Sequence, residues 1–385
     1  MAKVVMALTN DCVSDPRVEK EARALGAAGH DVTILAWDRS GEHALTEERD
    51  GFRVERLGPR AQYGGGVRSL PLFRAFWANA VRRALAVAPD VVHCHDLDTA
   101  QVGLDVLRVA PDTRLVLDHH EIYRHTRMVP QRGVVGSAAR WFVDTLDRRS
   151  ARAASLVVVA NPGNEPHYRR LAEGKVVVVE NAPDAQRFHP RTEPRPERPF
   201  TLGYVGQKRY VESLAMLVRI VERNRSLAAL LAGGGVAEDA VARMAEQAQR
   251  VRAIGRLRYD EIPAYYEDVD AVWGVYDAAV GNIKTAFPVK VMEGMACALP
   301  VLVDAGTWIG DYVMREGIGV AVDGRDEAAV ERTLLQLAED AERAAQMGAK
   351  GRTLVEAGLN WEAASRRLVD AYARMLARER PEAIA

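Results

Sequence analysis

Short apolar runs alternate with longer amphipathic stretches through the first half of the chain. The run at 4–8 is followed by a stretch over 16–28 in which Val18, Ala22 and Leu25 fall on one helical face. Further apolar runs of strand length lie at 31–37, 90–93, 115–117, 156–159 and 176–179. Strands that are apolar on both faces and are separated by helices predict a parallel sheet covered on both sides.

The stretch from Asp184 to Pro199 interrupts this pattern, because it carries four prolines among charged residues and has no apolar period. Residues 186–199 are therefore predicted to form a linker. Strand-like runs then resume at 200–205, 228–232, 271–275 and 300–303, and helices are predicted over 288–298, 326–347 and 361–379. We predict an α/β protein whose two Rossmann-like, doubly wound domains, 1–185 and 200–360, face a central cleft where ligands bind.

The amino-acid composition limits the classes of protein to which this chain can belong. The chain has 385 residues, of which 48% are hydrophobic and 27% charged, as is typical of globular proteins. Its 52 basic and 53 acidic residues give a net charge of −1, so nothing in the overall charge favours nucleic-acid binding. No apolar stretch approaches a membrane span, and the run at 4–8 is too short for a signal-peptide core. Three widely separated cysteines, with neither a disulfide framework nor a zinc-ligand spacing, also predict a cytoplasmic location.

The most informative stretch is 287–301, in which Pro288 stands at the predicted start of a helix. Lys290 and Glu293 are three residues apart and so share one face of the first turns. Free amides at a helix start attract a phosphate, a lysine adds a positive charge, and a carboxylate can accept two hydrogen bonds from a ribose diol. The alternative is a surface ion pair on an ordinary helix. The apolar helix that follows, closely coupled to a strand, favours nucleotide binding.

This stretch resembles the nucleotide-sugar signature of the retaining glycosyltransferases of family 4, which have the two-domain GT-B fold. Pro288, Lys290 and Glu293 match a pattern that occurs in the family, and Glu293 matches the glutamate that holds the donor ribose. The family usually has another glutamate eight residues earlier, where this chain has Thr285. The chain therefore departs from the family at its usual contact with the donor sugar ring.

Other segments follow the family's order along nearly the whole chain, namely 15–25, 89–96, 118–121, 203–206, 233–235 and 255–257. The resemblance implies a donor site in the second domain, formed by Gly206, Arg256, Leu257, Ala286, Phe287, Pro288, Lys290 and Glu293. It places five residues of the first domain on the acceptor side, namely Asn10, Arg17, His95, Asp96 and Glu121.

Histidines and acids gather at the predicted ends of two neighbouring strands, namely His93, His95, His119 and His120 with Asp96, Asp118 and Glu121. One alternative is that some of these histidines are structural. Another is a metal site, because His-x-His with carboxylates can bind zinc. Since GT-B enzymes resemble one another in working without a bound metal, we predict no metal site. His120 is predicted to be a catalytic residue that contacts the transferred sugar, whereas His119 packs.

Two adjacent cations, Lys208 and Arg209, follow the turn at Gly206. Family members commonly place an arginine and a lysine after this glycine, where both neutralise the leaving diphosphate. Lys208 and Arg209 are therefore predicted catalytic residues, and the sequence does not decide between them. The alternative is a solvated charge pair.

The resemblance implies an enzyme that transfers a sugar from a nucleoside-diphosphate sugar to an alcohol, glycan or lipid-linked glycan, with retention and without a cofactor. One alternative is a nucleotide-sugar epimerase or hydrolase on the same fold, for which Thr285 leaves room. Another is a non-catalytic partner subunit. The resemblance also implies that the last helix, within 361–385, packs on the first domain.

Two segments, 67–88 and 124–142, combine apolar residues with arginines. Basic amphipathic segments can lie on an anionic bilayer, so a peripheral contact with the inner face of the membrane is one interpretation. The alternative is a helix that faces the core and exposes a basic side to solvent.

Overall fold

The computed structural model describes the chain except for residues 14, 63–68, 127, 193–196 and 379–385. The chain divides into two units. The first contains Met1–Glu180 together with the residues from Ala364 onward, and the second contains Asn181–Ala363. Parts of four predicted segments lie outside the described residues, namely the linker 186–199, the basic segments 67–88 and 124–142, and the last helix within 361–385.

The first unit contains an eight-stranded sheet in the order β3-β4-β2-β1-β5-β6-β7-β8. All its pairs are parallel except β3 with β4. The strands are β1 (Lys3–Leu8), β2 (Asp31–Trp37), β3 (Thr46–Arg49), β4 (Phe52–Leu57), β5 (Val91–His95), β6 (Arg114–His119), β7 (Leu156–Val159) and β8 (Val176–Val178). The central strands are buried on both faces, as the continuous apolar runs predict.

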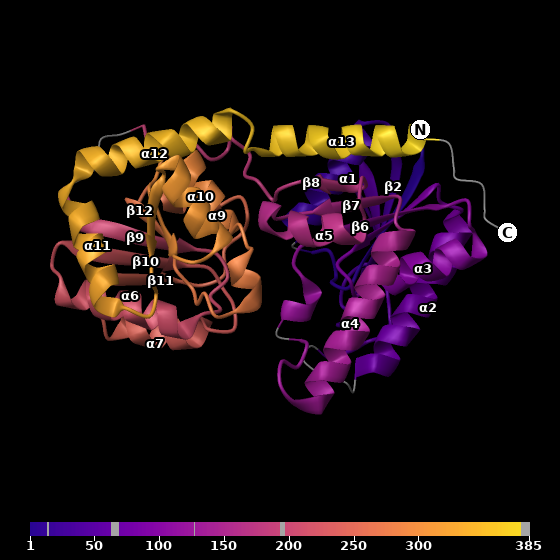
Figure 1. The fold of residues 1–385 in the computed structure, drawn as a ribbon, viewed down its shortest axis with the longest axis horizontal. Coiled ribbons are helices and arrows are strands. Elements are labelled where there is room, and N and C mark those ends of the chain that lie inside the picture. Colours follow the sequence, from indigo (N-terminus) through magenta and orange to yellow (C-terminus); the bar gives the residue numbers. More distant parts are fainter. Residues whose placement is uncertain (14, 63–68, 127, 193–196, 379–385) are drawn as a thin grey trace. The chain divides into compact units, whose positions relative to one another are not determined.

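In the part of the first unit that the structure describes, the α-helices are α1 (Pro16–Ala27), α2 (Leu70–Val87), α3 (Ala100–Val109), α4 (Gly133–Ala153), α5 (Glu165–Leu171) and, from Ala364 on, α13 (Trp361–Ala377). α1 begins at a proline, and the Asp15 side chain caps it by accepting from the Val18 amide. α2 buries Phe76, which stacks on Trp37. In the described part of 67–88, the apolar face therefore covers the core. α13, yellow in Figure 1, lies along this unit.

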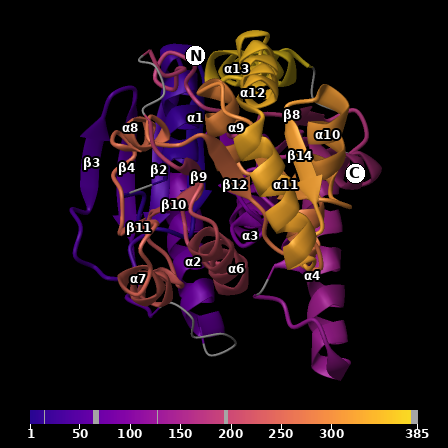
Figure 2. The same ribbon diagram turned by 90° about the vertical axis from the view of Figure 1, so that its left-hand side faces the viewer.

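The second unit contains a parallel six-stranded sheet in the order β11-β10-β9-β12-β13-β14. The strands are β9 (Phe200–Val205), β10 (Leu227–Ala232), β11 (Val251–Ile254), β12 (Ala271–Gly274), β13 (Val301–Asp304) and β14 (Gly319–Val322). The helices are α6 (Val211–Arg223), α7 (Glu238–Glu246), α8 (Ile262–Tyr266), α9 (Val289–Ala296), α10 (Trp308–Glu316), α11 (Glu327–Glu339) and α12 (Ala341–Glu356). Figure 2 shows α11 beside β14.

The prediction of one helix over 326–347 is wrong, because α11 ends at Glu339 and α12 begins at Ala341. Asp340 separates the two helices and caps the second, since its side chain accepts from the Arg343 amide. The apolar period continues across this break, which explains why the pattern suggested one helix.

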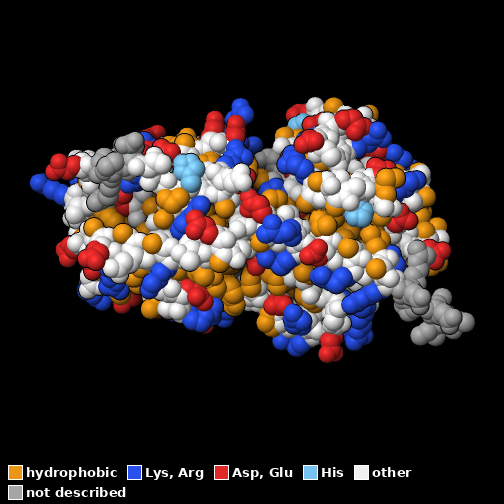
Figure 3. Space-filling model, turned by 90° about the horizontal axis from the view of Figure 1, so that it is seen from above, with side chains coloured by type: hydrophobic (Ala, Val, Ile, Leu, Met, Phe, Trp, Pro, Cys, Tyr) orange, Lys and Arg blue, Asp and Glu red, His pale blue; other side chains and the backbone are white. Residues whose placement is uncertain are grey.

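Acidic and basic side chains are intermixed over the face drawn in Figure 3, in keeping with the net charge of −1. Cys12, Cys94 and Cys297 are buried free thiols. Among the helices in the described part of the chain, none combines the length and apolar character that crossing a membrane requires.

Candidate functional site

The polar residues of the first unit gather where the order of its strands reverses direction. β1 and β5 are neighbours in the sheet, although β2, β3 and β4 lie between them in the chain. β6 follows β5, and His95 pairs in register with Asp118. The turns that follow these strands therefore emerge at one edge, which is where doubly wound sheets bind ligands.

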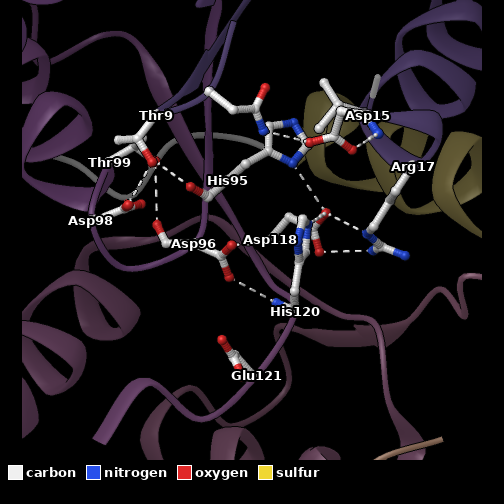
Figure 4. Close-up of polar contacts among 12 residues, drawn as sticks. Thr9, Asp15, Arg17, His95, Asp96, Asp98, Thr99, Asp118, His120 and Glu121 are labelled. Carbon is white, nitrogen blue, oxygen red and sulfur yellow. Dashed lines mark hydrogen bonds and ion pairs between the residues drawn. The ribbon is translucent and has the colours of Figure 1, made fainter. Parts of the chain in front are cut away.

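Asp118 is the centre of this cluster (Figure 4). Its two carboxylate oxygens accept from Arg17 Nε and Nη2 at 2.9 and 2.8 Å. Two imidazoles lie 3.2 Å from one of these oxygens, His95 through Nδ1 and His120 through Nε2. Burial opposes ionisation of Asp118, but Arg17 and His120 outweigh it and hold its pKa well below the usual range. Asp118 is therefore a buried carboxylate anion.

His120 is the partly exposed member of the cluster, with 27% of its side chain accessible. Its Nδ1 lies 3.3 Å from Asp96 Oδ2, while its Nε2 faces Asp118. Burial disfavours the charged ring, but Asp96 and Asp118 outweigh it and raise the pKa of His120 to about 10. His120 is therefore an imidazolium at neutral pH. Asp96 adopts a left-handed conformation, φ 61°, and its Oδ1 accepts from the His120 amide.

A deeper layer lies behind Asp118. Arg17 Nη2 also pairs with Glu21 at 2.9 Å. Burial raises the pKa of Glu21 to about 8, although Arg17 opposes this, and burial holds the pKa of His93 well below its usual value. The His93 ring stacks on His95 at a centroid distance of 4.5 Å, and its Nδ1 forms a 2.7 Å hydrogen bond with the Tyr372 hydroxyl of α13. A residue of the last helix therefore fixes the orientation of a buried histidine in this cluster.

Two imidazoles and two carboxylates in this layer form a possible donor set for a metal ion. The ligand atoms of Glu21, His93, His95 and Asp118 all lie within 4.8 Å of one another. Such a set suits zinc chemically. The guanidinium of Arg17, however, already pairs with both carboxylates. The chain thus supplies the compensating positive charge itself.

The other residues predicted in the first unit lie around this cluster. Asn10 donates to Asp15 at 2.8 Å, which ties the loop after β1 to the start of α1. Glu121 lies apart from the carboxylate–histidine contacts in Figure 4. His119 stacks on Tyr168 at 4.2 Å and packs in the interior. Asp98, which was not among the predicted site residues, accepts from the Thr9 hydroxyl at 2.6 Å.

We expect His120→Gln to remove part of the pH dependence of stability between pH 6.5 and pH 10. The folded-state pKa of His120, about 10, lies above its ordinary value of 6.5. Its contribution is therefore complete below pH 6.5 and is lost as the pH rises through 10. Urea midpoints measured across this range, with the exposed His189→Gln variant as control, test the prediction. Parallel curves for the parent and His120→Gln would contradict it.

In the second unit, the order of strands reverses between β9 and β12, and two glycine turns pack against each other there. Gly206 and Gly233 both have positive φ, 132° and 122°. A Cβ on Gly233 would lie 2.1 Å from the Gly206 carbonyl oxygen, and one on Gly235 would lie 2.6 Å from that of Lys208. Only glycine allows this approach of the two turns.

Lys290 lies in the first turn of α9, which Pro288 precedes. Its ammonium lies 3.1 Å from the ring centre of Tyr204, a cation–π contact, and a Cβ on Gly206 would lie 3.4 Å from Lys290 Cε. Burial holds the pKa of Lys290 well below its usual range. One turn further on, buried Glu293 accepts from the Tyr266 hydroxyl at 2.8 Å. The structure thus brings the glycine turn and the start of α9 together.

The sequence did not decide whether Lys208 or Arg209 faces the diphosphate. In the structure, the two side chains lie in different surroundings. Lys208 is buried and donates to the Ile254 carbonyl at 2.6 Å, and burial lowers its pKa. Arg209 is exposed and donates to Gln207 at 2.8 Å. Arg209 is therefore the more accessible cation of this turn.

The remaining residues predicted for the donor site lie on neighbouring loops. Arg256 is exposed, and its Cβ lies 3.4 Å from the position that a Cβ on Gly234 would occupy. Phe287 is buried against Trp308 and Tyr312, each at a centroid distance of 5.4 Å. Leu257 packs against the core of the unit, and Ala286 is half-buried.

Comparison with known families accounts for most of the chain. Residues 14–182 match the Glycosyl transferase 4-like domain. Residues 156–354, more than half of the chain, match the Glycosyl transferases group 1. The chain belongs to the group 1 glycosyl transferases. The resemblance to glycosyltransferase family 4 that the sequence motifs predicted is thereby confirmed.

A curated relative of this group 1 glycosyl transferase is the D-inositol 3-phosphate glycosyltransferase of Salinispora tropica, 28% identical over 235 residues. The match covers 54% of this chain and 47% of the relative, so the chain spans about half the length of that protein.

Two solved structures of similar proteins share the fold of this group 1 glycosyl transferase. Sucrose-phosphate synthase from Thermosynechococcus elongatus has a TM-score of 0.81 at 18% identity, covering 98% of this chain and 100% of that one. Alr3699/HepE from Anabaena, solved with UDP and glucose, has a TM-score of 0.73 at 14% identity, covering 97% and 100%. The predicted GT-B fold is confirmed.

The side chains that orient the predicted site residues of this glycosyl transferase were not among the predicted residues. Tyr372 contacts His93 from 279 positions away, and Tyr266 contacts Glu293. The Lys290 ammonium lies over the ring of Tyr204. For Tyr204 the signal was available, because this tyrosine stands near the carboxyl end of β9.

Proposed function

We propose that this chain transfers a sugar from a nucleoside-diphosphate sugar to an acceptor hydroxyl, with retention of anomeric configuration and without a bound metal ion. The observation that carries the proposal is the buried ammonium of Lys290, placed beside the Gly206 turn at the start of α9. A desolvated cation next to a helix start favours a diphosphate. HepE, which has the same fold, was solved with UDP and glucose.

On the donor side, Lys290, Arg209 and the first amides of α9 would neutralise the diphosphate as it leaves. Lys208, held by the Ile254 carbonyl, would support the turn that carries Arg209. Glu293 would accept from the ribose hydroxyls while Tyr266 keeps its carboxylate oriented. Fixed charges that face developing negative charge are an effective means of stabilising a transition state.

In the proposed reaction, the acceptor oxygen forms a bond to the anomeric carbon while the bond from that carbon to the diphosphate oxygen breaks. The acceptor proton passes to the departing diphosphate, so charge and atoms balance without an enzyme nucleophile. In the first unit, the His120 imidazolium and Asp96 would contact sugar and acceptor hydroxyls through their partly exposed atoms. The acceptor would be an alcohol, a glycan or a lipid-linked glycan. A lipid-linked acceptor would lie at the inner face of the membrane.

The test begins with a thermal-shift panel of nucleoside diphosphates and their sugars, and continues with product analysis in the presence and absence of acceptor alcohols. The proposal expects stabilisation by one nucleotide family and a glycoside whose anomeric configuration matches the donor. Free sugar alone would indicate a hydrolase, and an altered nucleotide sugar an epimerase. Binding without turnover of any donor would indicate a non-catalytic subunit.

We expect Glu293→Ala to weaken binding of the nucleoside diphosphate by about 1.5–3 kcal/mol, because a charged acceptor for the ribose is lost. Isothermal titration calorimetry measures the effect. Glu246→Ala, at the exposed end of α7, removes the same charge elsewhere in the unit and should leave binding unchanged. If Glu293→Ala folds normally and binds like the parent, the assignment to the ribose is wrong.

We expect turnover to survive an excess of chelator. Both Asp-x-Asp pairs of the chain use an aspartate for internal contacts, since Asp98 accepts from Thr9 and Asp270 accepts from Arg198 and the Thr201 amide. Cationic side chains and helix amides take over charge neutralisation in the proposed site. Initial rates with and without EDTA are the measurement. If activity is lost in EDTA and restored by magnesium or manganese, the metal-free mechanism is wrong.

A further inference from the structure

The first half of α4 exposes several large apolar side chains. Val134, Val135, Trp141 and Phe142 are 87%, 73%, 70% and 60% exposed, and Met128, shortly before the helix, is 66% exposed. These five account for nearly half of the exposed large hydrophobic residues of the described chain, and the others are scattered singly. Single exposed hydrophobic residues are ordinary, but a cluster marks an interaction surface.

Helical geometry places these side chains together. Residues seven positions apart lie nearly above one another on a helix, so Val134 aligns with Trp141 and Val135 with Phe142. Figures 1 and 2 show this end of α4 extending beyond the sheet of the first unit. This contrasts with α2, whose apolar residues cover the core. Among the described residues of the two basic amphipathic segments, the exposed apolar cluster therefore lies in the one that contains the start of α4.

Three exposed arginines continue the same face toward the end of the helix, namely Arg148, Arg149 and Arg152. Arg148 follows Trp141 by seven residues and Arg149 follows Phe142 by seven, roughly 10 Å along the axis in each case. None of the three forms an ion pair with a carboxylate among the described residues. We define the α4 face as Val134, Val135, Trp141, Phe142, Arg148, Arg149 and Arg152.

The acidic residues of α4 pair with residues outside this face. Asp144 pairs with Arg124 at 2.9 Å. Asp147 is buried and lies 3.3 Å from His167. The α4 face is thus an apolar cluster continued by uncompensated positive charge.

We propose that the α4 face docks on an anionic lipid bilayer. Trp141, Phe142 and the two valines would enter the boundary between headgroups and acyl chains, while the arginines contact lipid phosphates. Complementary charge favours this occupant over a second copy of the chain, because a two-fold contact through the α4 face would bring six arginines together. The inference rests on the proposed function only in that a lipid-linked acceptor gives the contact a purpose.

Vesicle flotation tests the proposal with the full chain and without donor or acceptor, so its outcome is separate from that of the activity. We expect binding to vesicles of phosphatidylcholine with about one third phosphatidylglycerol, weaker binding in high salt, and little binding to phosphatidylcholine alone. Trp141→Ser with Phe142→Ser should weaken partitioning about tenfold or more. Arg148→Gln with Arg149→Gln should weaken it roughly fivefold per arginine, on anionic vesicles only.

Matched controls remove the same chemistry elsewhere. Val236→Ser with Met314→Ser removes two exposed hydrophobic side chains of the second unit, and Arg74→Gln with Arg82→Gln removes two exposed charges from α2. Both controls should bind like the parent. The proposal is overturned if the parent does not float with anionic vesicles, or if the Trp141/Phe142 variant floats equally well. It is also overturned if size-exclusion chromatography shows that the parent is a dimer and this variant a monomer, because a second copy would then cover the face.

Discussion

Replacing Arg17 with methionine is expected to lower the free energy of unfolding of the first unit by about 3–5 kcal/mol. Arg17 holds Asp118 with two hydrogen bonds, pairs with Glu21 and also donates to the Val179 carbonyl at 2.8 Å. Without it, Asp118 is a buried anion that has lost its principal cation. Hydrogen exchange of the β1, β5 and β6 amides reports the loss, and peptides of the second unit serve as an internal reference.

Arg23 offers a matched control on the same helix. It is half-exposed, and its contact with Asp50 is 4.0 Å long. Arg23→Met should therefore change stability by no more than about 0.5 kcal/mol. Adding Asp118→Asn to Arg17→Met should recover part of the loss, because the unpaired charge is then removed. Equal effects of Arg17→Met and Arg23→Met would show that the buried ion pair does not stabilise the unit.

The strands were predictable where burial dictates the pattern. β2 and β9 occupy the predicted ranges, because a strand covered on both faces is apolar at most of its positions. β3 could not be predicted this way, since its four residues, Thr46–Arg49, are all polar and form the edge of the sheet. The break at Asp340 was missed because it depends on a side-chain cap and leaves the apolar period unchanged.

The candidate site, like the strands, was predictable where it depends on the strand pattern and not where it depends on side-chain contacts. Residues at strand ends, such as His95 and Asp118, could be placed at one edge of a sheet as soon as their strands were recognised. The contacts that hold this cluster could not be predicted, because Arg17 is 101 positions from its partner Asp118 and Tyr372 is 279 positions from its partner His93. Such pairs follow from helix packing, and a periodic pattern carries no information about which side chains a helix places opposite a strand.

Replacing Lys290 with methionine is expected to reduce turnover about 10²–10³-fold, while the stability of the second unit stays the same or rises. The loss follows from removing a fixed cation that faces the leaving diphosphate. Stability should not fall, because burial disfavours the charged ammonium in the folded protein and holds its pKa well below the usual range. Among the described residues, Lys290 Nζ contacts the ring of Tyr204 but forms no hydrogen bond or ion pair with an anion. Methionine fills a similar volume without that cost.

The measurements are kcat and KM for the nucleotide sugar, together with urea denaturation of both proteins. Lys284→Met, at an exposed position six residues earlier, removes the same charge and should leave turnover unchanged. Lys290→Arg should recover little, because a larger guanidinium would have to enter the buried position that the compact ammonium occupies. If Lys290→Met lowers stability and turnover together, the lysine is a structural group. A selective loss of turnover in a protein of equal or greater stability is the result expected of a cation that is desolvated in order to receive a diphosphate.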